Sequence, residues 1–354
     1  MKENITVIIP THNYRFNLVQ RLLDYYKDFS IEIIIEDGSK KKLKKRFSKN
    51  INYFHFPEKD FISRIIHAIE HSRTKYVAIN QDDDFLIYSS LIKAKKYLDS
   101  NKEYSFISGK IFNFEDYLKS TFFKETYSLS SIGSIKSKNN FNRLLMFSNK
   151  APMLVASLFK KKDLLKTLYR YQKFQKKISL EKKNKFNELA FSLFMFSEFN
   201  YKYLDIVWQL RDRNVYPFEK KSFFKDLSRP LENTEINLNN PIYSPLFKEI
   251  KKLYKFEKNL DFEILLIDVL KKFSNKKNQF LIMLDCYKDK IKFIFPSLFK
   301  ILKLISKFFR LFLLNRSESL RFKHEIASKI NKNEYIKFFY VLKKHRLSIN
   351  KLIN

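Results

Sequence analysis

Short apolar runs alternate with amphipathic stretches through residues 5–212. Apolar, β-branched runs of about five residues predict buried strands, and they lie at 5–9, 31–35, 51–56, 76–79, 104–109, 153–159 and 201–210. Apolar residues at helical spacing predict helices between them, at 15–28, 61–69, 89–98 and 186–199. This alternation predicts an α/β fold, with a mixed, mostly parallel sheet flanked by helices.

The pattern changes after Pro217. A polar stretch there is interrupted by Pro230, Pro241 and Pro245, and helical periodicity dominates the rest of the chain. We therefore predict a first domain at 1–215, a connector at 216–245 and a helical C-terminal domain at 246–354 that associates with a membrane or with other subunits.

Three consecutive carboxylates, Asp82, Asp83 and Asp84, follow the predicted strand at 76–79. Adjacent carboxylates repel one another, so a cation or a set of donors is needed to share their charge. Open α/β sheets bind ligands at the carboxyl ends of their strands. A hard divalent metal, Mg²⁺ or Mn²⁺, that holds a diphosphate fits this position. The alternative is an acidic turn that caps a helix beginning near Ser89.

Two further loops follow strand ends. Pro10 ends the first strand and the polar segment 11–13 follows it, while Asp37 and Gly38 close the second strand. The chain has only 3 glycines, so Gly38 indicates a turn with positive φ or a close backbone approach to a ligand. Asp37 is placed to accept a hydrogen bond from a base or a ribose. A simple turn aspartate is the alternative for Asp37.

Composition narrows the class of protein. A net charge of +33 favours a polyanionic partner, either nucleic acid or an anionic membrane face. The dense basic run at 40–46 is typical of a solvated surface, or else attracts phosphates of lipid or substrate. The single cysteine, Cys286, excludes an internal disulfide. No run of about 18 uncharged apolar residues occurs, and a strand begins at Ile5, so we expect a cytoplasmic protein without a signal peptide.

One stretch, 296–316, combines apolar and basic residues. Its cations at 300, 303, 307 and 310 share one helix face, opposite a wide apolar band. This pattern is typical of an interfacial helix on the inner face of the cytoplasmic membrane. A domain helix with its apolar side in the core and its lysines in water is the alternative.

Three motifs together resemble the family 2 glycosyltransferases of GT-A fold: Ile8-Ile9-Pro10-Thr11-His12-Asn13, Glu36-Asp37-Gly38-Ser39 and Asp82-Asp83-Asp84-Phe85. The resemblance covers 5–212. It implies an enzyme that moves a sugar, with inversion, from a nucleotide-sugar to a hydroxyl of a saccharide or lipid-linked acceptor. It further implies a UDP-sugar as donor, Mn²⁺ or Mg²⁺ as cofactor, and a role in surface polysaccharide or glycolipid biosynthesis.

The resemblance also implies roles for single residues. Thr11 and Asp37 hold the base and ribose, Asp84 and Asp82 hold the metal, and Glu188 is the catalytic base. A helix-start acid stabilised by the helix dipole is the alternative for Glu188. The remaining donor-binding positions are Pro10, Asn13, Arg15, Asp83 and Arg211. Many relatives carry Asn-Arg-Pro where this chain has Asn13-Tyr14-Arg15, so Arg15 is the residue that would take the place of the family's arginine. The chain departs from the family pattern at Leu189, where relatives often carry Asp, and has no histidine near 201–210.

Two other classes compete with this one. A nucleotidyltransferase could use the same sheet and acid pair, but the chain has no glycine-rich phosphate loop. A basic module that binds nucleic acid or membrane without catalysis explains the charge, yet gives no reason for the acidic triplet. We therefore do not expect nucleic acid as the partner.

Overall fold

The computed structural model describes residues 3–12, 15–117, 120–125, 133–150, 155–177, 188–212, 244–253 and 316–351. Asn13, most of the predicted connector at 216–245 and all but the last residue of the predicted helix at 296–316 lie outside these ranges. Within the described residues, no helix is both long enough and apolar enough to cross a bilayer.

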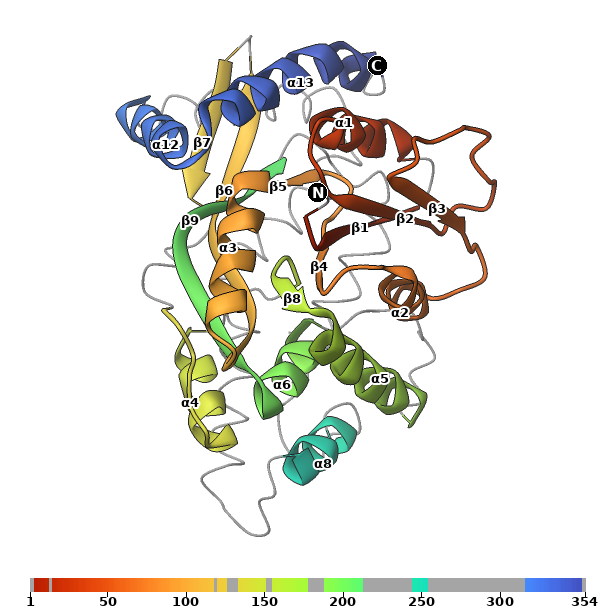
Figure 1. The fold of residues 1–354 in the computed structure, drawn as a ribbon, viewed down its shortest axis with the longest axis vertical. Helices are drawn as coiled ribbons and strands as arrows, with labels where there is room; N and C mark the ends of the chain where they lie inside the picture. Colours follow the sequence, from red (N-terminus) through yellow and green to blue (C-terminus); the bar gives the residue numbers. More distant parts are fainter. Residues whose placement is uncertain are drawn as a thin grey trace, which may run out of the picture.

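The centre of the protein is one mixed, mostly parallel sheet, which confirms the predicted fold class (Figure 1). Its strand order is β3-β2-β1-β4-β8-β6-β9-β5, and β7 pairs with β6. The strands are β1 (Ile5–Thr11), β2 (Glu32–Asp37), β3 (Ile51–His55), β4 (Tyr76–Ile79), β5 (Asp84–Leu86), β6 (Tyr104–Tyr117), β7 (Ser120–Glu125), β8 (Leu158–Lys160) and β9 (Asn200–Asp212). β1 to β4 are parallel, so their carboxyl ends lie at one edge of the sheet.

Helices cover both faces of this sheet (Figure 1). Side chains alternate along β1, so Ile8 packs into one apolar cluster while Val7 and Ile9 pack into the other. The Ile8 side is covered by α2 (Phe61–His71), α4 (Asn140–Lys150), α5 (Lys161–Lys177), α6 (Glu188–Glu198) and α8 (Ser244–Leu253). The opposite side is covered by α1 (Phe16–Tyr26), α3 (Tyr88–Ser100), α12 (Arg316–Lys329) and α13 (Lys332–Lys351).

One local prediction was wrong, and one alternative is excluded. Of the strand predicted at 153–159, the described residues 155–157 form a turn, and only 158 and 159 belong to a strand, the three-residue β8. The acidic triplet does not cap α3: Ile87 is the N-cap residue and makes no side-chain cap bond. Instead Glu334 of α13 accepts the backbone N–H groups of Tyr88 at 2.5 Å and Ser89 at 3.0 Å.

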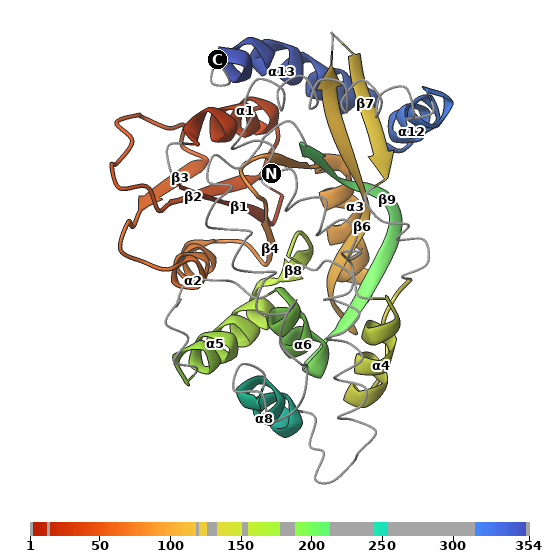
Figure 2. The ribbon, with the colours of Figure 1, turned by 180° about the vertical axis from the view of Figure 1, so that it is seen from behind.

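The C-terminal helices pack against the sheet. In Figures 1 and 2, α13 lies beside α1 and α12 lies beside β7. Phe322 and Ile326 of α12 and Phe338 of α13 are buried in the same apolar cluster as β1 and α1. These helices therefore complete the core on the face of the sheet that carries α1 and α3.

Candidate active site

The three aspartates form a tight turn between β4 and β5, which we call the aspartate turn (Asp82–Asp84). Asp82 and Asp83 occupy the turn itself, and Asp84 begins β5. The buried Asn80 amide donates to the carbonyl of Asp84 at 3.0 Å, while the Asn80 N–H donates to Ile8 of β1 at 2.8 Å. The turn is thus tied to the strand that carries Thr11.

Asp82 is nearly inaccessible, with 3% of its surface exposed. Thr11 Oγ1 donates to its carboxylate at 2.8 Å, and Arg15 Nη2 lies 3.1 Å away. The same guanidinium bonds the partly exposed Asp83 carboxylate at 2.8 Å. Burial raises the pKa of Asp82, and the charge of Arg15 opposes that rise. The structure therefore brings four predicted donor-site residues together: Arg15 contacts Asp82 and Asp83, and Thr11 bonds Asp82.

Asp84 points toward β9 and meets a second group of donors. Gln209 Nε2 donates to its carboxylate at 2.8 Å, and the Asp212 backbone N–H does so at 3.3 Å. Arg211 Nε lies 3.3 Å from the same carboxylate. Burial raises the pKa of Asp84, and Asp83 raises it further, while Arg211 lowers it. The predicted residue Arg211 thus lies against a predicted metal ligand.

The oxygen ligands of the aspartate turn fit a hard divalent cation. Mg²⁺ and Mn²⁺ commonly use one or two protein carboxylates together with substrate phosphates and water. Asp82 and Asp84 provide those two carboxylates, and each is already held by a cationic side chain. Within the described residues, no group of three or more acidic, histidine or cysteine side chains is arranged to hold a metal ion, so a metal here would depend on two carboxylates together with oxygens of the donor and water.

Asp37 ends β2 and is paired in register with Thr11 of β1. One carboxylate oxygen accepts the Ser39 N–H at 2.8 Å, and the other accepts the Tyr53 hydroxyl at 2.7 Å. Asp37 is 4% exposed, and burial together with the bond to Asp37 raises the pKa of Tyr53 to about 12. Pro10 precedes Thr11 on β1, opposite Glu36. The predicted base-binding positions therefore share one sheet edge.

Arg64 of α2 was not predicted. Its Nη1 donates to the carbonyl of Thr11 at 3.0 Å and to that of Glu36 at 2.9 Å, so it clamps the ends of β1 and β2 together. A Cβ atom on Gly38 would lie 2.7 Å from the Arg64 guanidinium carbon. Gly38 does mark a close approach, but its neighbour is this side chain. An arginine among the isoleucines of α2 was the one signal in the sequence.

Arg21 of α1 was also missed. It is buried, and its Nη1 pairs with Asp212 at 2.5 Å. Its Nη2 donates to the Asp83 carbonyl at 2.8 Å. The pair holds the aspartate turn between α1 and the end of β9.

Glu188 is the first described residue of α6, in the helix that was predicted at 186–199. Its side chain, like the whole of Asn13, lies outside the described part of the structure. Three histidines near the site contact protein groups: His55 bonds the Ser39 carbonyl, His67 the Glu36 carboxylate and His71 the His67 carbonyl.

Comparison with known proteins identifies the type of domain. The profile of the family described as glycosyl transferase family 2 matches residues 6–197, more than half of the chain. Among solved structures, Staphylococcus aureus TarS 1–349 is similar at 14% identity, with 77% of this chain and 80% of that chain covered and a TM-score of 0.43. The complex of TarS 1–349 with UDP-GlcNAc gives 14% identity, coverage of 78% and 81%, and a TM-score of 0.43. The comparison with curated proteins finds no match.

Proposed function

The chain belongs to glycosyltransferase family 2, and from this premise we propose an inverting, metal-dependent transfer of a sugar from a UDP-sugar to an acceptor hydroxyl. The acceptor we propose is a saccharide or a lipid-linked sugar of a surface polysaccharide or glycolipid. The observation that carries the proposal is the aspartate turn, where two buried carboxylates are each held by an arginine at the ligand-binding edge of the sheet.

Asp37 is the residue we assign to the base. Each of its carboxylate oxygens accepts one hydrogen bond from the protein, which leaves further lone pairs for a ligand. A carboxylate that accepts favours the N3–H of uracil over cytosine, whose N3 carries no proton. Thr11, one strand away, would contact the ribose.

We assign the diphosphate to the two arginines that contact the aspartate turn. Arg15 and Arg211 keep 23% and 20% of their side chains exposed, so both can reach a ligand. Asp82 and Asp84 would hold the metal, which neutralises charge on the departing diphosphate when it is bound. Arg64 keeps the strand ends of this site in register through the carbonyls of Thr11 and Glu36.

Glu188 is the base we propose. Its carboxylate takes the proton of the acceptor hydroxyl while the hydroxyl oxygen attacks the anomeric carbon. The bond from that carbon to the diphosphate oxygen breaks as the new glycosidic bond forms, and the nucleoside diphosphate leaves from the opposite face.

Calorimetric binding of UDP, CDP, GDP and CMP in the presence of Mn²⁺ tests the assignment of the donor. We expect UDP to bind at least about tenfold more tightly than CDP, since one bond to a charged acceptor is worth roughly 1.5–3 kcal/mol. Asp37→Asn narrows this preference. The matched control is Asp99→Asn, which changes an exposed aspartate paired with Lys75. This variant keeps the preference for UDP over CDP. Equal affinity of the wild-type protein for all four nucleotides refutes the role of Asp37.

A further inference from the structure

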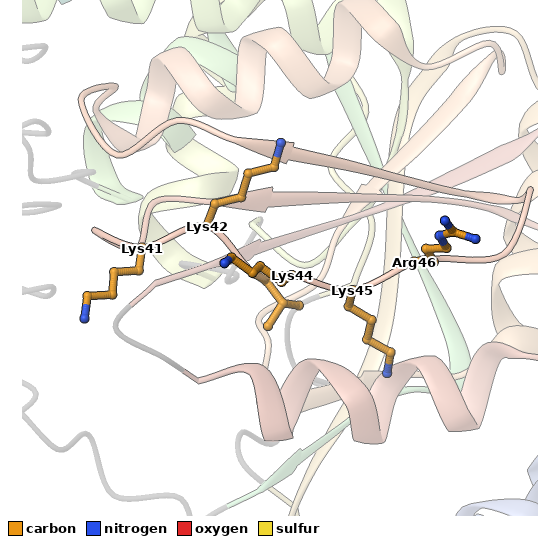
Figure 3. Close-up of a pocket in the computed structure, with 6 residues that line it drawn as sticks. Lys41, Lys42, Lys44, Lys45 and Arg46 are labelled. Carbon is orange, nitrogen blue, oxygen red and sulfur yellow. The ribbon is translucent and has the colours of Figure 1, made fainter.

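A basic surface element lies between β2 and β3. Six of the seven residues of the basic loop (Lys40–Arg46) are cations, and all six are exposed. Figure 3 shows five of these side chains, from Lys41 to Arg46, projecting to both sides of the loop. The residues 41–46 line an open pocket of about 650 Å³. In the described part of the chain, none of these six cations forms an ion pair with a carboxylate. Their charge is therefore available to an external anion.

The second element is the outward face of α13. Lys332, Ile336, Tyr340 and Lys344 follow one another at four-residue spacing, so they form one row along the helix, which we call the outer row. Ile336 is 56% exposed and Tyr340 61% exposed. The inner face of the same helix carries the buried Phe338 and Val341. Two large apolar side chains thus face outward between two lysines.

The two elements meet across α1. Lys45 of the basic loop donates to Gln20 Oε1, and Gln20 Nε2 donates to Asp24 Oδ1 one turn further along α1 at 2.9 Å. Lys344 of the outer row bonds Asp24 at 2.5 Å. Both ribbon views place α13 beside α1 (Figures 1 and 2). The basic loop and the outer row are therefore linked across α1 through Gln20 and Asp24.

Three carboxylates of the described residues near this surface are already paired with cations or buried. Asp24 is paired with Lys344 and His345, and Asp28 with Lys337. Glu334 of α13 is 3% exposed and caps α3. The surface therefore presents an excess of positive charge together with an apolar row.

We propose that the basic loop and the outer row dock this protein onto an anionic phospholipid bilayer. Attraction of the cations to anionic headgroups and insertion of the apolar side chains at the acyl boundary both favour binding. An anionic bilayer therefore complements both elements. A nucleic-acid backbone complements the cations but offers nothing to Ile336 and Tyr340. This contact uses other residues than the membrane contact predicted at 296–316. The proposal does not depend on the assignment of the donor site.

Co-sedimentation of the full chain with vesicles tests this proposal. The vesicles contain phosphatidylcholine alone or with 30 mol% phosphatidylglycerol, at about 0.15 M salt. The loop variant is Lys41→Gln/Lys42→Gln/Lys44→Gln, and the row variant is Ile336→Ser/Tyr340→Ser. The control variant is Lys162→Gln/Lys173→Gln/Lys176→Gln, which removes the same charge from exposed positions of α5 on the opposite face of the sheet. Thermal unfolding verifies that each variant is folded.

We expect binding to anionic vesicles and none to neutral ones. Each removed loop cation weakens binding about fivefold, so the loop variant loses on the order of a hundredfold. The row variant also weakens binding, and the control variant matches the wild type. Three results overturn the proposal: no binding to anionic vesicles, equal losses in the loop and control variants, or a row variant that binds like wild type. Tight binding of duplex DNA without vesicle binding, or a dimer that only the row variant dissociates, would reassign the surface to nucleic acid or to a second copy.

Discussion

Glu334 is the residue through which α13 holds the N-terminus of α3, and its replacement by glutamine has a measurable cost. Its carboxylate accepts three hydrogen bonds, from the N–H groups of Tyr88 and Ser89 and from the Tyr25 hydroxyl at 2.5 Å. Glutamine keeps one accepting oxygen and turns an amide NH₂ toward at least one of these buried or half-buried donors. The substitution thus leaves at least one donor unsatisfied and removes the charge at a helix N-terminus.

The magnitude follows from these losses. A buried donor without a partner costs about 1–3 kcal/mol, and an acidic cap contributes about 0.5–2 kcal/mol. We expect Glu334→Gln to lower the free energy of unfolding by roughly 2–4 kcal/mol, a large share of the 5–15 kcal/mol typical of a folded domain.

Equilibrium unfolding in urea, followed by the fluorescence of Trp208, measures this loss. Trp208 is the one tryptophan in the chain, and its carbonyl accepts the N–H of Ile87, the residue that precedes α3. The control is Glu325→Gln, which removes a quarter-exposed carboxylate from Lys110 and Lys329. Partly exposed ion pairs contribute about 1 kcal/mol or less. If Glu334→Gln costs no more than this control, α13 does not hold α3 through its carboxylate.

Three further predictions concern the edge of the sheet. Burial raises the pKa of Glu36 to about 8 and lowers that of His67 to about 4. Between pH 6.5 and 8, Glu36 is therefore protonated in the folded chain and ionised in the unfolded chain, while His67 is neutral in both. The free energy of unfolding consequently falls as the pH rises through this range. Glu36→Gln removes this fall. If the free energy of unfolding depends on pH equally in the wild type and in Glu36→Gln, the prediction is wrong. Gly38→Ala displaces the Arg64 guanidinium from two carbonyls, which lowers the free energy of unfolding measured in urea by about 2–3 kcal/mol. An unchanged urea midpoint refutes the role of Arg64 as a clamp. Arg15→Gln weakens UDP binding about tenfold or more in calorimetry, whereas an unchanged Kd removes it from the site.

Local patterns were enough for the parallel half of the fold. The predicted strand at 76–79 is β4 with the same bounds, and the helix predicted at 61–69 is α2, which extends to His71. Each βαβ unit is built from neighbouring segments whose periodicity differs, so the sequence specifies it directly. The three-residue strands β5 and β8 are too short to show a period, and their pairing depends on distant strands.

The residues that we did not predict contact partners far away in the sequence. Arg21 pairs with Asp212, which lies 191 residues away, and Arg64 bonds the Thr11 carbonyl across 53 residues. Glu334 reaches Tyr88 across 246 residues. Such partners depend on how the elements pack, so no spacing in the sequence reveals them. The aspartates were found because three adjacent carboxylates after an apolar strand need a local explanation.

Titration of UDP into the wild-type protein and into Asp84→Asn, each with Mn²⁺ and with a chelator, is the most direct test of the account. Asp84 accepts from Gln209 and lies against Arg211, and the substitution keeps the size of the side chain while it replaces one carboxylate oxygen, a group that a metal would need, by an NH₂ group. Asp99→Asn is the control. We predict binding that requires Mn²⁺ in the wild type and the control and is lost in folded Asp84→Asn. Equal binding by all three proteins in the presence of chelator, or none by the folded wild type, contradicts a metal-dependent donor site at the aspartate turn.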